Sequence, residues 1–303
     1  MARCRGDQRD ESRYLANRWR ASITVLHVDP LPGLGTVAVE PIYIAPQVFE
    51  GLHAEHDARV ETQLAELRDE FLSHAGPGVT LETERRRGEA TSGIIEFAQG
   101  WQPDLIVMGS QGVSGLSQMV LGSTADRVSR IAPCPVLIAG RADDAGDDER
   151  RFTRVIAAVD YSELTAPVAQ AAAAVVESTG VLELVHIWNP PYLSALNVSL
   201  GGDRPDLLAM TEQARQAQAE DIVSLSADLA LEHERIDHFV GSGEPALALL
   251  ERAEETSADL IVLGAHSHSD LGERVLGTVA DRVLRYARIP VLLCPRAAIG
   301  GVE

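Results

Sequence analysis

The stretch that decides the fold is residues 104–138, DLIVMGSQGVSGLSQMVLGSTADRVSRIAPCPVLI. It begins with a short apolar run, residues 105–108, which predicts a buried strand. A loop rich in Gly and Ser follows, then residues 123–126 begin an amphipathic helix, and a second apolar run ends the unit at residues 135–138. A strand, a glycine loop and a helix N-terminus in this order predict a phosphate-binding site.

The same unit recurs at residues 259–293, where 19 of 35 positions are identical at an offset of 155. The chain is therefore expected to contain two copies of one domain, which suits its length of 303 residues. We expect the first domain over residues 1–140 and the second over residues 152–303. The polar, acidic residues 141–151 predict a linker between them.

Strand and helix patterns alternate along both copies, which predicts an α/β fold. We expect two doubly wound, Rossmann-like domains with five-stranded parallel sheets. The first copy begins abnormally, because residues 1–12 contain no apolar run that could be a buried central strand. Residues 13–20 suit the end of the helix that follows such a strand. We expect the first copy to lack a normal first strand, either by natural truncation or because the true start lies upstream.

Composition excludes several classes of protein. The net charge is −19 and both halves are acidic, so neither domain has the basic surface of a nucleic-acid binder. The absence of lysine excludes the phosphate-loop lysine, the kinase lysine and Schiff-base chemistry. No apolar run approaches the ~18 residues of a membrane span, so a cytoplasmic protein is expected. The cysteines, Cys4, Cys134 and Cys294, show no metal or redox spacing, which predicts buried, reduced thiols.

The loop carries a recognisable pattern: Gly109-x-x-Gly112, nine residues, then Gly122-Ser123. This spacing resembles the ATP-binding signature of the universal stress protein family, and the resemblance covers nearly the whole chain, twice. It implies a doubly wound fold, often dimeric or tandem, and adenine-nucleotide binding in a subset of members.

Physical reasons accompany the resemblance in the first copy. Glycines let backbone N–H groups approach phosphate oxygens, and a helix N-terminus favours an anion. The capping box Ser123-x-x-Asp126 is the alternative reading of this helix start. The candidate nucleotide-binding residues of the first copy are Val28, Met108, Gly109, Gly112, Gly122, Ser123 and Thr124.

The second copy departs from the signature, because Ser267 replaces the second glycine. The resemblance implies that Asp160 contacts the ribose or base edge of a nucleotide. A turn or capping aspartate is the alternative. His266 and His268 are interpreted as solvated loop residues and not as metal ligands. The candidate nucleotide-binding residues of the second copy are Asp160, Ile187, Leu263, Gly264, Ser267, Gly277 and Thr278.

The remaining polar residues suggest no catalytic constellation. His27 and His186 occupy matching strand positions and are interpreted as histidines satisfied within the sheet. The basic run 85–87 is interpreted as a solvated strand end.

The expected function is an ATP-binding stress-response regulator without rapid catalysis, with Mg²⁺ as the counter-charge. The alternatives are a nucleotide-independent interaction module of the same fold and a slow ATP hydrolase. The apolar last strands are edge candidates, and such edges tend to be paired or covered. We therefore expect the two copies to pair through them, while association into a homodimer stays open.

Overall fold

The computed structural model describes residues 6–29, 46–110, 121–140, 151–188, 205–231, 233–265 and 276–296. The chain divides into two compact units. One is Arg9–Gly100, and the other is Trp101–Glu303 together with Met1–Gln8.

The smaller unit is a two-stranded parallel sheet covered by helices. Its elements are α1 (Gly6–Trp19), β1 (Ser22–Asp29), α2 (Pro46–Ser73), β2 (Thr80–Arg87) and α3 (Ala90–Trp101). Ala16, Phe71 and Leu81 form the buried core between the sheet, α1 and α2. Val28 points to the opposite face, where a Cβ on Gly93 of α3 would lie 2.9 Å from its side chain. The apolar residues of β1 therefore alternate between two helix-covered faces.

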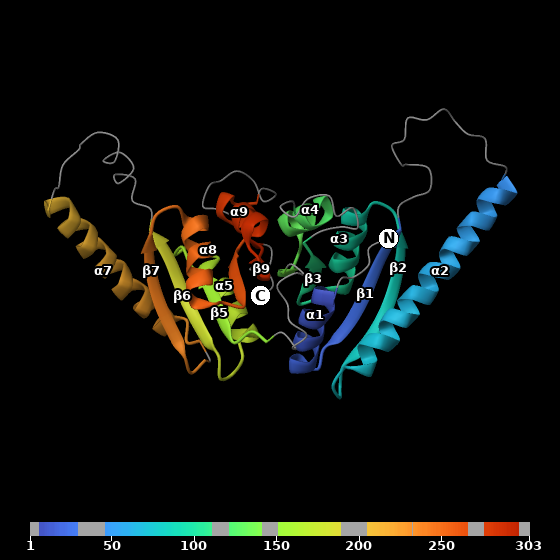
Figure 1. Cartoon of the computed structure of the whole chain (residues 1–303), viewed down its shortest axis with the longest axis horizontal. Helices are drawn as coiled ribbons and strands as arrows, with labels where there is room; N and C mark the ends of the chain where they lie inside the picture. Colours follow the sequence, from blue (N-terminus) through green and yellow to red (C-terminus); the bar gives the residue numbers. More distant parts are fainter. Residues whose placement is uncertain are drawn as a thin grey trace, which may run out of the picture. The chain divides into compact units, whose positions relative to one another are not determined.

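The larger unit contains a seven-stranded sheet in the order β3-β4-β9-β8-β5-β6-β7 (Figure 1). Its first-copy elements are β3 (Ile106–Gly109), α4 (Ser123–Ile131) and β4 (Val136–Ala139). Its second-copy elements are β5 (Arg154–Ala158), α5 (Thr165–Val175), β6 (Val181–Trp188), α7 (Pro205–Asp228), β7 (Ile236–Ser242), α8 (Pro245–Thr256), β8 (Leu260–Gly264), α9 (Thr278–Tyr286) and β9 (Val291–Cys294).

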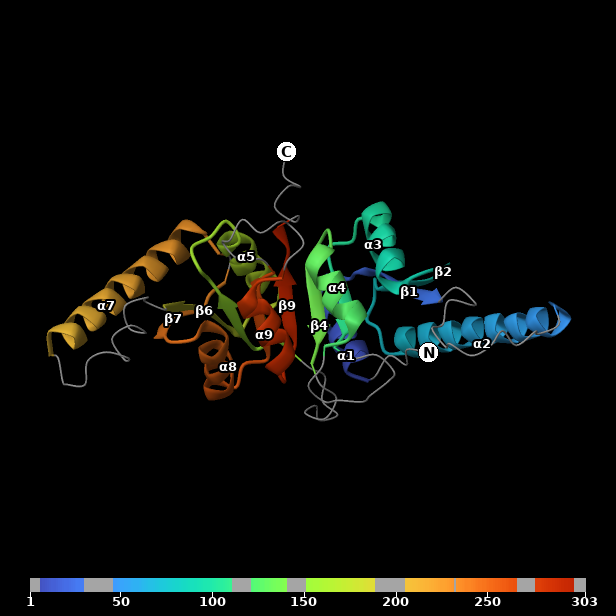
Figure 2. The same ribbon diagram turned by 90° about the horizontal axis from the view of Figure 1, so that it is seen from above.

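The second copy is a complete doubly wound domain. Its strands β9-β8-β5-β6-β7 are all parallel to one another. Figure 2 shows α5 and α7 on one face of this sheet and α8 and α9 on the other. The central strand β5 is fully buried at Val155, Ile156 and Ala157, because helices cover both of its faces. The α/β prediction is confirmed, with five parallel strands in this copy.

The first copy does not form the five-stranded sheet expected for each domain. Its four described strands lie in two separate sheets, with β1 paired to β2 and β3 paired to β4. In the second copy β5 lies between β6 and β8, the counterparts of β1 and β3. No strand of the described residues takes the place of β5, and the first element described there is α1, the counterpart of α5. Because β5 is the strand that joins the two halves of such a sheet, the lack of a described equivalent explains why this copy is divided.

The last strands of the two copies lie side by side. β4 pairs with β9 in antiparallel register, with Leu137 opposite Leu292. Two helices that follow the glycine loops carry matching ion pairs, Arg130–Asp126 on α4 and Arg285–Asp281 on α9. Arg130 also lies 3.7 Å from Asp281, which links the two helices.

Two expectations about the whole chain concern membranes and thiols. In the described ranges, no helix combines the length and apolar character that crossing a membrane requires. Cys134 and Cys294 are free and buried, as predicted. Cys4 and most of the predicted linker lie outside the described residues.

Candidate functional site

A cavity of about 160 Å³ opens at the carboxyl ends of the second-copy strands. Six residues singled out from the sequence line it: Asp160, Ile187, Leu263, Gly264, Gly277 and Thr278. The seventh, Ser267, lies outside the described residues, as do His266 and His268. In a doubly wound sheet this edge is where ligands bind.

The walls of the cavity are almost entirely apolar. They come from the ends of β5, β6 and β8 and from helices α5, α8 and α9, with Leu164, Val185 and Leu249 among them. Asp160 and Thr278 carry the only polar side chains of the described lining. Such a site can bury the flat, apolar part of a ligand. Polar groups of the ligand are then recognised at the rim of the cavity.

Asp160 lies at that rim, two residues beyond β5. Its Oδ1 accepts a hydrogen bond from the backbone N–H of Ser162 at 3.0 Å, so the turn interpretation is correct. Ser162 in turn accepts from the N–H of Leu164, the N-cap residue of α5. The carboxylate is exposed and lines the cavity, so its turn contact does not take it away from the site.

The N-terminus of α9 forms another side of the cavity. Gly277 is the N-cap residue and makes no side-chain cap, so Thr278 is the first helical residue. The N–H of Gly277 donates to the carbonyl of Ala265 at 2.8 Å, which holds the end of the loop against the end of β8. Asp281 pairs with Arg285 instead of reaching back to the helix start. No capping box closes this start among the described residues, so the first N–H groups of α9 stay available to an anion.

Sequence reasoning missed the contribution of α8. Gly243 adopts a positive φ of 127°, and Glu244 then caps α8 by accepting from the N–H of Leu247 at 2.9 Å. Pro245 follows as the first helical residue and lines the cavity. Arg282 of α9 lies 2.9 Å from Glu244, so the starts of α8 and α9 are linked at this edge. A Gly-Glu-Pro sequence before an apolar run marks the start of this helix, but it does not show that the helix lines the cavity.

The first-copy candidates are divided between the two units. Met108 and Gly109 end β3, while Gly122 caps α4 without a side-chain bond and Ser123 and Thr124 begin it. The N–H of Gly122 donates to the carbonyl of Ser110 at 2.8 Å, as Gly277 does to Ala265. Here too the N-cap is glycine, so the capping box of Ser123 is wrong.

Two first-copy candidates do not lie with that group. Val28 belongs to the other unit, and Gly112 lies outside the described residues.

The matching histidines of β1 and β6 have different partners. His186 Nδ1 donates to the carbonyl of Val159 at 2.8 Å, and its ring lies 4.7 Å from that of Tyr161. His27 instead hydrogen-bonds Oδ1 of Asp29 at 2.8 Å through Nε2. Both histidines have a hydrogen-bond partner, as expected. Only His186 bonds the backbone of the turn that follows β5.

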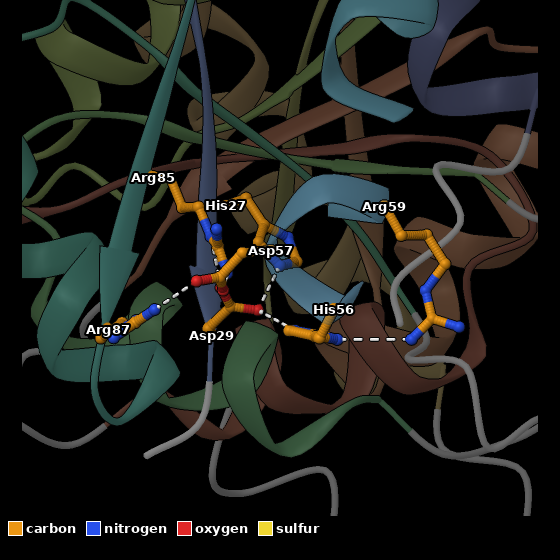
Figure 3. Close-up of polar contacts among 7 residues, drawn as sticks. All are labelled: His27, Asp29, His56, Asp57, Arg59, Arg85 and Arg87. Atoms are coloured by element: carbon orange, nitrogen blue, oxygen red, sulfur yellow. Dashed lines mark hydrogen bonds and ion pairs between the residues drawn. The ribbon is translucent and has the colours of Figure 1, made fainter. Parts of the chain in front are cut away.

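A charged cluster unique to the first copy surrounds Asp29 (Figure 3). His27 and His56 share its Oδ1, while the Nε–H of Arg85 donates to its Oδ2 at 2.5 Å. Asp57 of α2 accepts from Arg85 and from Arg87. The cluster therefore ties α2 to the ends of β1 and β2.

The basic run 85–87 is thus a solvated strand end only in part: the Arg87 side chain is 54% exposed, but the interpretation does not hold for Arg85. The Arg85 side chain is only 19% exposed, and Arg86 lies over the Phe97 ring, 4.9 Å from its centroid. In the second copy, the strand positions of Asp29, Arg85 and Arg87 are taken by Trp188, Val240 and Ser242, so the fold does not require the charges.

The carboxyl group of Asp29 belongs to a residue that is 4% exposed. Burial by itself raises its pKa, but hydrogen bonds from His56, His27 and Arg85 outweigh that effect and lower the pKa to about 2. The cluster holds no nucleophile, and no His, Cys, Asp or Glu side chains of the described residues are arranged so that three or more could hold a metal ion. Its chemistry is that of a structural ion-pair network.

Comparison with known proteins supports the presence of two copies of one domain in the sequence. The model of the Universal stress protein family matches residues 11–140 and again residues 151–295. A universal stress protein of Mycobacterium tuberculosis is 31% identical over 281 residues, covering 89% of this chain and 86% of the relative. One from Mycolicibacterium smegmatis is 26% identical over 289 residues, covering 92% and 91%.

The fold is shared with solved structures. A universal stress protein from Archaeoglobus fulgidus superposes with a TM-score of 0.62 at 23% identity, covering 97% of this chain and 93% of that one. With the repeated glycine loops and a family match over each copy, the chain belongs to the universal stress protein family.

Proposed function

We propose that the chain is a stress-response regulator that binds an adenine nucleotide, ATP in the first place, in the second-copy cavity. The observation that carries this proposal is the convergence of six sequence-predicted residues on one apolar cavity. The base suits the walls around Val185 and Ile187, and the ribose suits the rim at Asp160. The phosphates suit the N-terminus of α9, where Gly277 leaves N–H groups uncapped.

The described cavity is smaller than the ~300–1,000 Å³ of typical small-molecule sites. A base with its sugar fills such a volume, while phosphates extend outward from it. The protein carries a net charge of −19, so a polyphosphate needs a cation, and Mg²⁺ is part of the proposal.

Titration calorimetry tests the site. ATP with Mg²⁺ should bind saturably, and Asp160→Ala should weaken binding about tenfold, since a charge-assisted hydrogen bond contributes about 1.5–3 kcal/mol. Asp160→Asn keeps an acceptor for Ser162 and is the matched control for the turn. No heat at millimolar ATP would overturn the proposal, and a match between GTP and ATP would remove the adenine preference.

Regulation by binding, without rapid turnover, is part of the same proposal. No acid–base pair accompanies Asp160 in the described lining, which favours binding over hydrolysis. Steady phosphate release that disappears with Asp160→Ala would instead identify a slow ATP hydrolase.

The interaction-module alternative is favoured by a different observation, the divided first copy. A partner that binds equally with and without ATP would support it.

Pairing of the two copies through their last strands is also proposed. The antiparallel register of β4 and β9 and the Arg130–Asp281 contact support it. Analytical ultracentrifugation would decide whether two chains associate further into a homodimer. The cytoplasmic location stays a prediction, which cell fractionation would check.

A further inference from the structure

Two helices that cover the same face of the second-copy sheet, α8 and α9, begin at the rim of the cavity (Figure 2). Pro245 of α8 and Thr278 of α9 both line it. Glu244 precedes Pro245 and accepts from the N–H of Leu247, so the start of α8 already holds a carboxylate. The start of α9 has a glycine N-cap without a side-chain bond. Of these two helix starts, that of α9 is the one that can offer its N–H groups to a ligand anion.

Arg282 of α9 brings a guanidinium to this rim. It lies four residues after Thr278, and residues four apart lie on the same face of a helix. Long side chains on a helix point back towards its N-terminus. Nη1 of Arg282 lies 2.9 Å from Oε1 of Glu244, so the side chain reaches the start of α8.

The Arg282 side chain has donors left for a second anion. It is 56% exposed, and the contact with Glu244 is its one ion pair or hydrogen bond within the part of the chain that the structure describes. A guanidinium carries several N–H donors in a planar fork, so it can bind a carboxylate and a phosphate oxygen together. Arg285, the other arginine of α9, instead bonds both carboxylate oxygens of Asp281.

The charges at the rim require a cation if several phosphates are to bind there. Asp160 lines the cavity, Glu244 precedes a lining residue, and the whole chain has a net charge of −19. Each phosphate beyond the first adds negative charge near these carboxylates, which repel it. Arg282 pairs with one of them and is therefore well placed to offset the added charge.

We propose that Arg282 is the residue by which the second-copy site recognises the distal phosphates of a nucleoside di- or triphosphate. This inference rests on the proposed function, because it assigns a role within the same site. Arg282 keeps its contact with Glu244 and donates from its remaining N–H groups to the phosphates beyond the first. The first phosphate is left to the N–H groups at the start of α9. The site then distinguishes nucleotides by the number of their phosphates.

Titration calorimetry of the whole chain with AMP and with ATP–Mg²⁺ tests this role. Arg282→Gln should weaken ATP binding about tenfold and AMP binding by less than about twofold, because the lost charge-assisted hydrogen bond serves only the distal phosphates. Arg288→Gln removes the same charge from an exposed position just beyond the other end of α9 and should leave ATP binding unaltered. Circular dichroism should show that both variants are folded.

Glu244→Gln provides a change in the opposite direction. Glutamine keeps an oxygen that can accept from the N–H of Leu247, so the cap of α8 is retained. Without the carboxylate, Arg282 serves the phosphates alone, and ATP binding should become severalfold tighter while AMP binding changes little. Weaker ATP binding by this variant would contradict the proposal.

The results separate this inference from the proposed function. ATP binding by the parent protein that is unchanged in Arg282→Gln would overturn the role of Arg282 alone. Equal losses of AMP and ATP affinity would do the same, because they would show a general distortion of the cavity. Equal losses of ATP affinity in Arg282→Gln and Arg288→Gln would reduce the effect to net charge. If the parent protein binds neither nucleotide, the proposed function fails and the role of Arg282 fails with it.

Discussion

His186 donates its Nδ1–H to the carbonyl oxygen of Val159 at 2.8 Å, which ties β6 to the turn that follows β5. If His186 were replaced by leucine, the Val159 carbonyl would lose this partner. Because Val159 is buried, no water would take its place. His186→Leu should lower the free energy of unfolding by about 1–3 kcal/mol. Urea denaturation measures this change, and His238→Leu at an exposed site of β7 is the matched control. Equal losses from the two variants would show that the hydrogen bond is unimportant.

The Asp29 cluster makes the stability of the smaller unit depend on acid. The pKa of Asp29 falls from its ordinary 3.8 to about 2, so the folded state binds its proton more weakly than the unfolded chain. The stabilisation is full above about pH 4 and is lost as the pH falls through about 2. It amounts to about 2 kcal/mol, since one pKa unit is about 1.36 kcal/mol.

Replacing the carboxylate tests the same cluster at neutral pH. Asp29→Asn leaves Arg85 beside a neutral amide, and removing one partner of a buried pair costs roughly 3 kcal/mol. Asp69→Asn removes an exposed partner of Arg68 and should change stability by less than about 1 kcal/mol. Thermal unfolding of both variants from pH 7 to pH 2 should show that only the Asp29→Asn protein loses the acid-dependent component. An unchanged pH profile would contradict the assignment.

A substitution at Thr278 should change the stability of the protein and its affinity for ATP in opposite directions. A carboxylate at the first residue of α9 interacts favourably with the helix dipole, so Thr278→Glu should stabilise the protein by about 0.3–1 kcal/mol. The same charge lies where the phosphates are proposed, so ATP affinity should fall severalfold or more. Thr278→Gln has the same length without the charge and should leave affinity closer to the parent. Stronger ATP binding by Thr278→Glu would exclude phosphates from this helix end.

The two buried thiols should be inert in the folded protein. Burial raises the pKa of Cys134 to about 11, with the charge of Asp104 adding to it, and burial raises the pKa of Cys294 to about 12. Since the thiolate is the nucleophile, iodoacetamide at pH 8 should leave both unmodified until urea unfolds the chain. Peptide mass spectrometry reports each site separately. Rapid labelling of Cys294 without denaturant would mean that β9 opens in the native state.

The repeated glycine loop was enough to predict the fold of the second copy. The unit of strand, loop, helix and strand that was predicted at residues 259–293 is formed by β8, α9 and β9. Residues 1–12 indicated a missing first strand because a buried strand needs an apolar run. What periodicity could not show is that the remaining strands then separate into two sheets, since strand pairing depends on the neighbour that is absent from the described residues.

The candidate site, too, could be predicted only in part from the sequence. Asp160, Gly264 and Thr278 follow from local spacing, and the structure brings them to one cavity. Pro245 and Leu249 come from a helix distant in sequence, so only the folded sheet places them there. The Asp29 cluster joins His56 and Arg85 from separate elements, and no local pattern marks charges that are paired across the fold.

The antiparallel junction of β4 and β9 also bears on how the protein unfolds. It places β3 and β4, which belong to the first copy, in one continuous sheet with the five strands of the second copy. We therefore expect the boundaries of cooperative unfolding to differ from the boundary between the two sequence copies. Heating should melt residues 101–303 as one large transition and residues 9–100 as a separate, smaller one, so a cut at the repeat boundary would sever the larger cooperative unit.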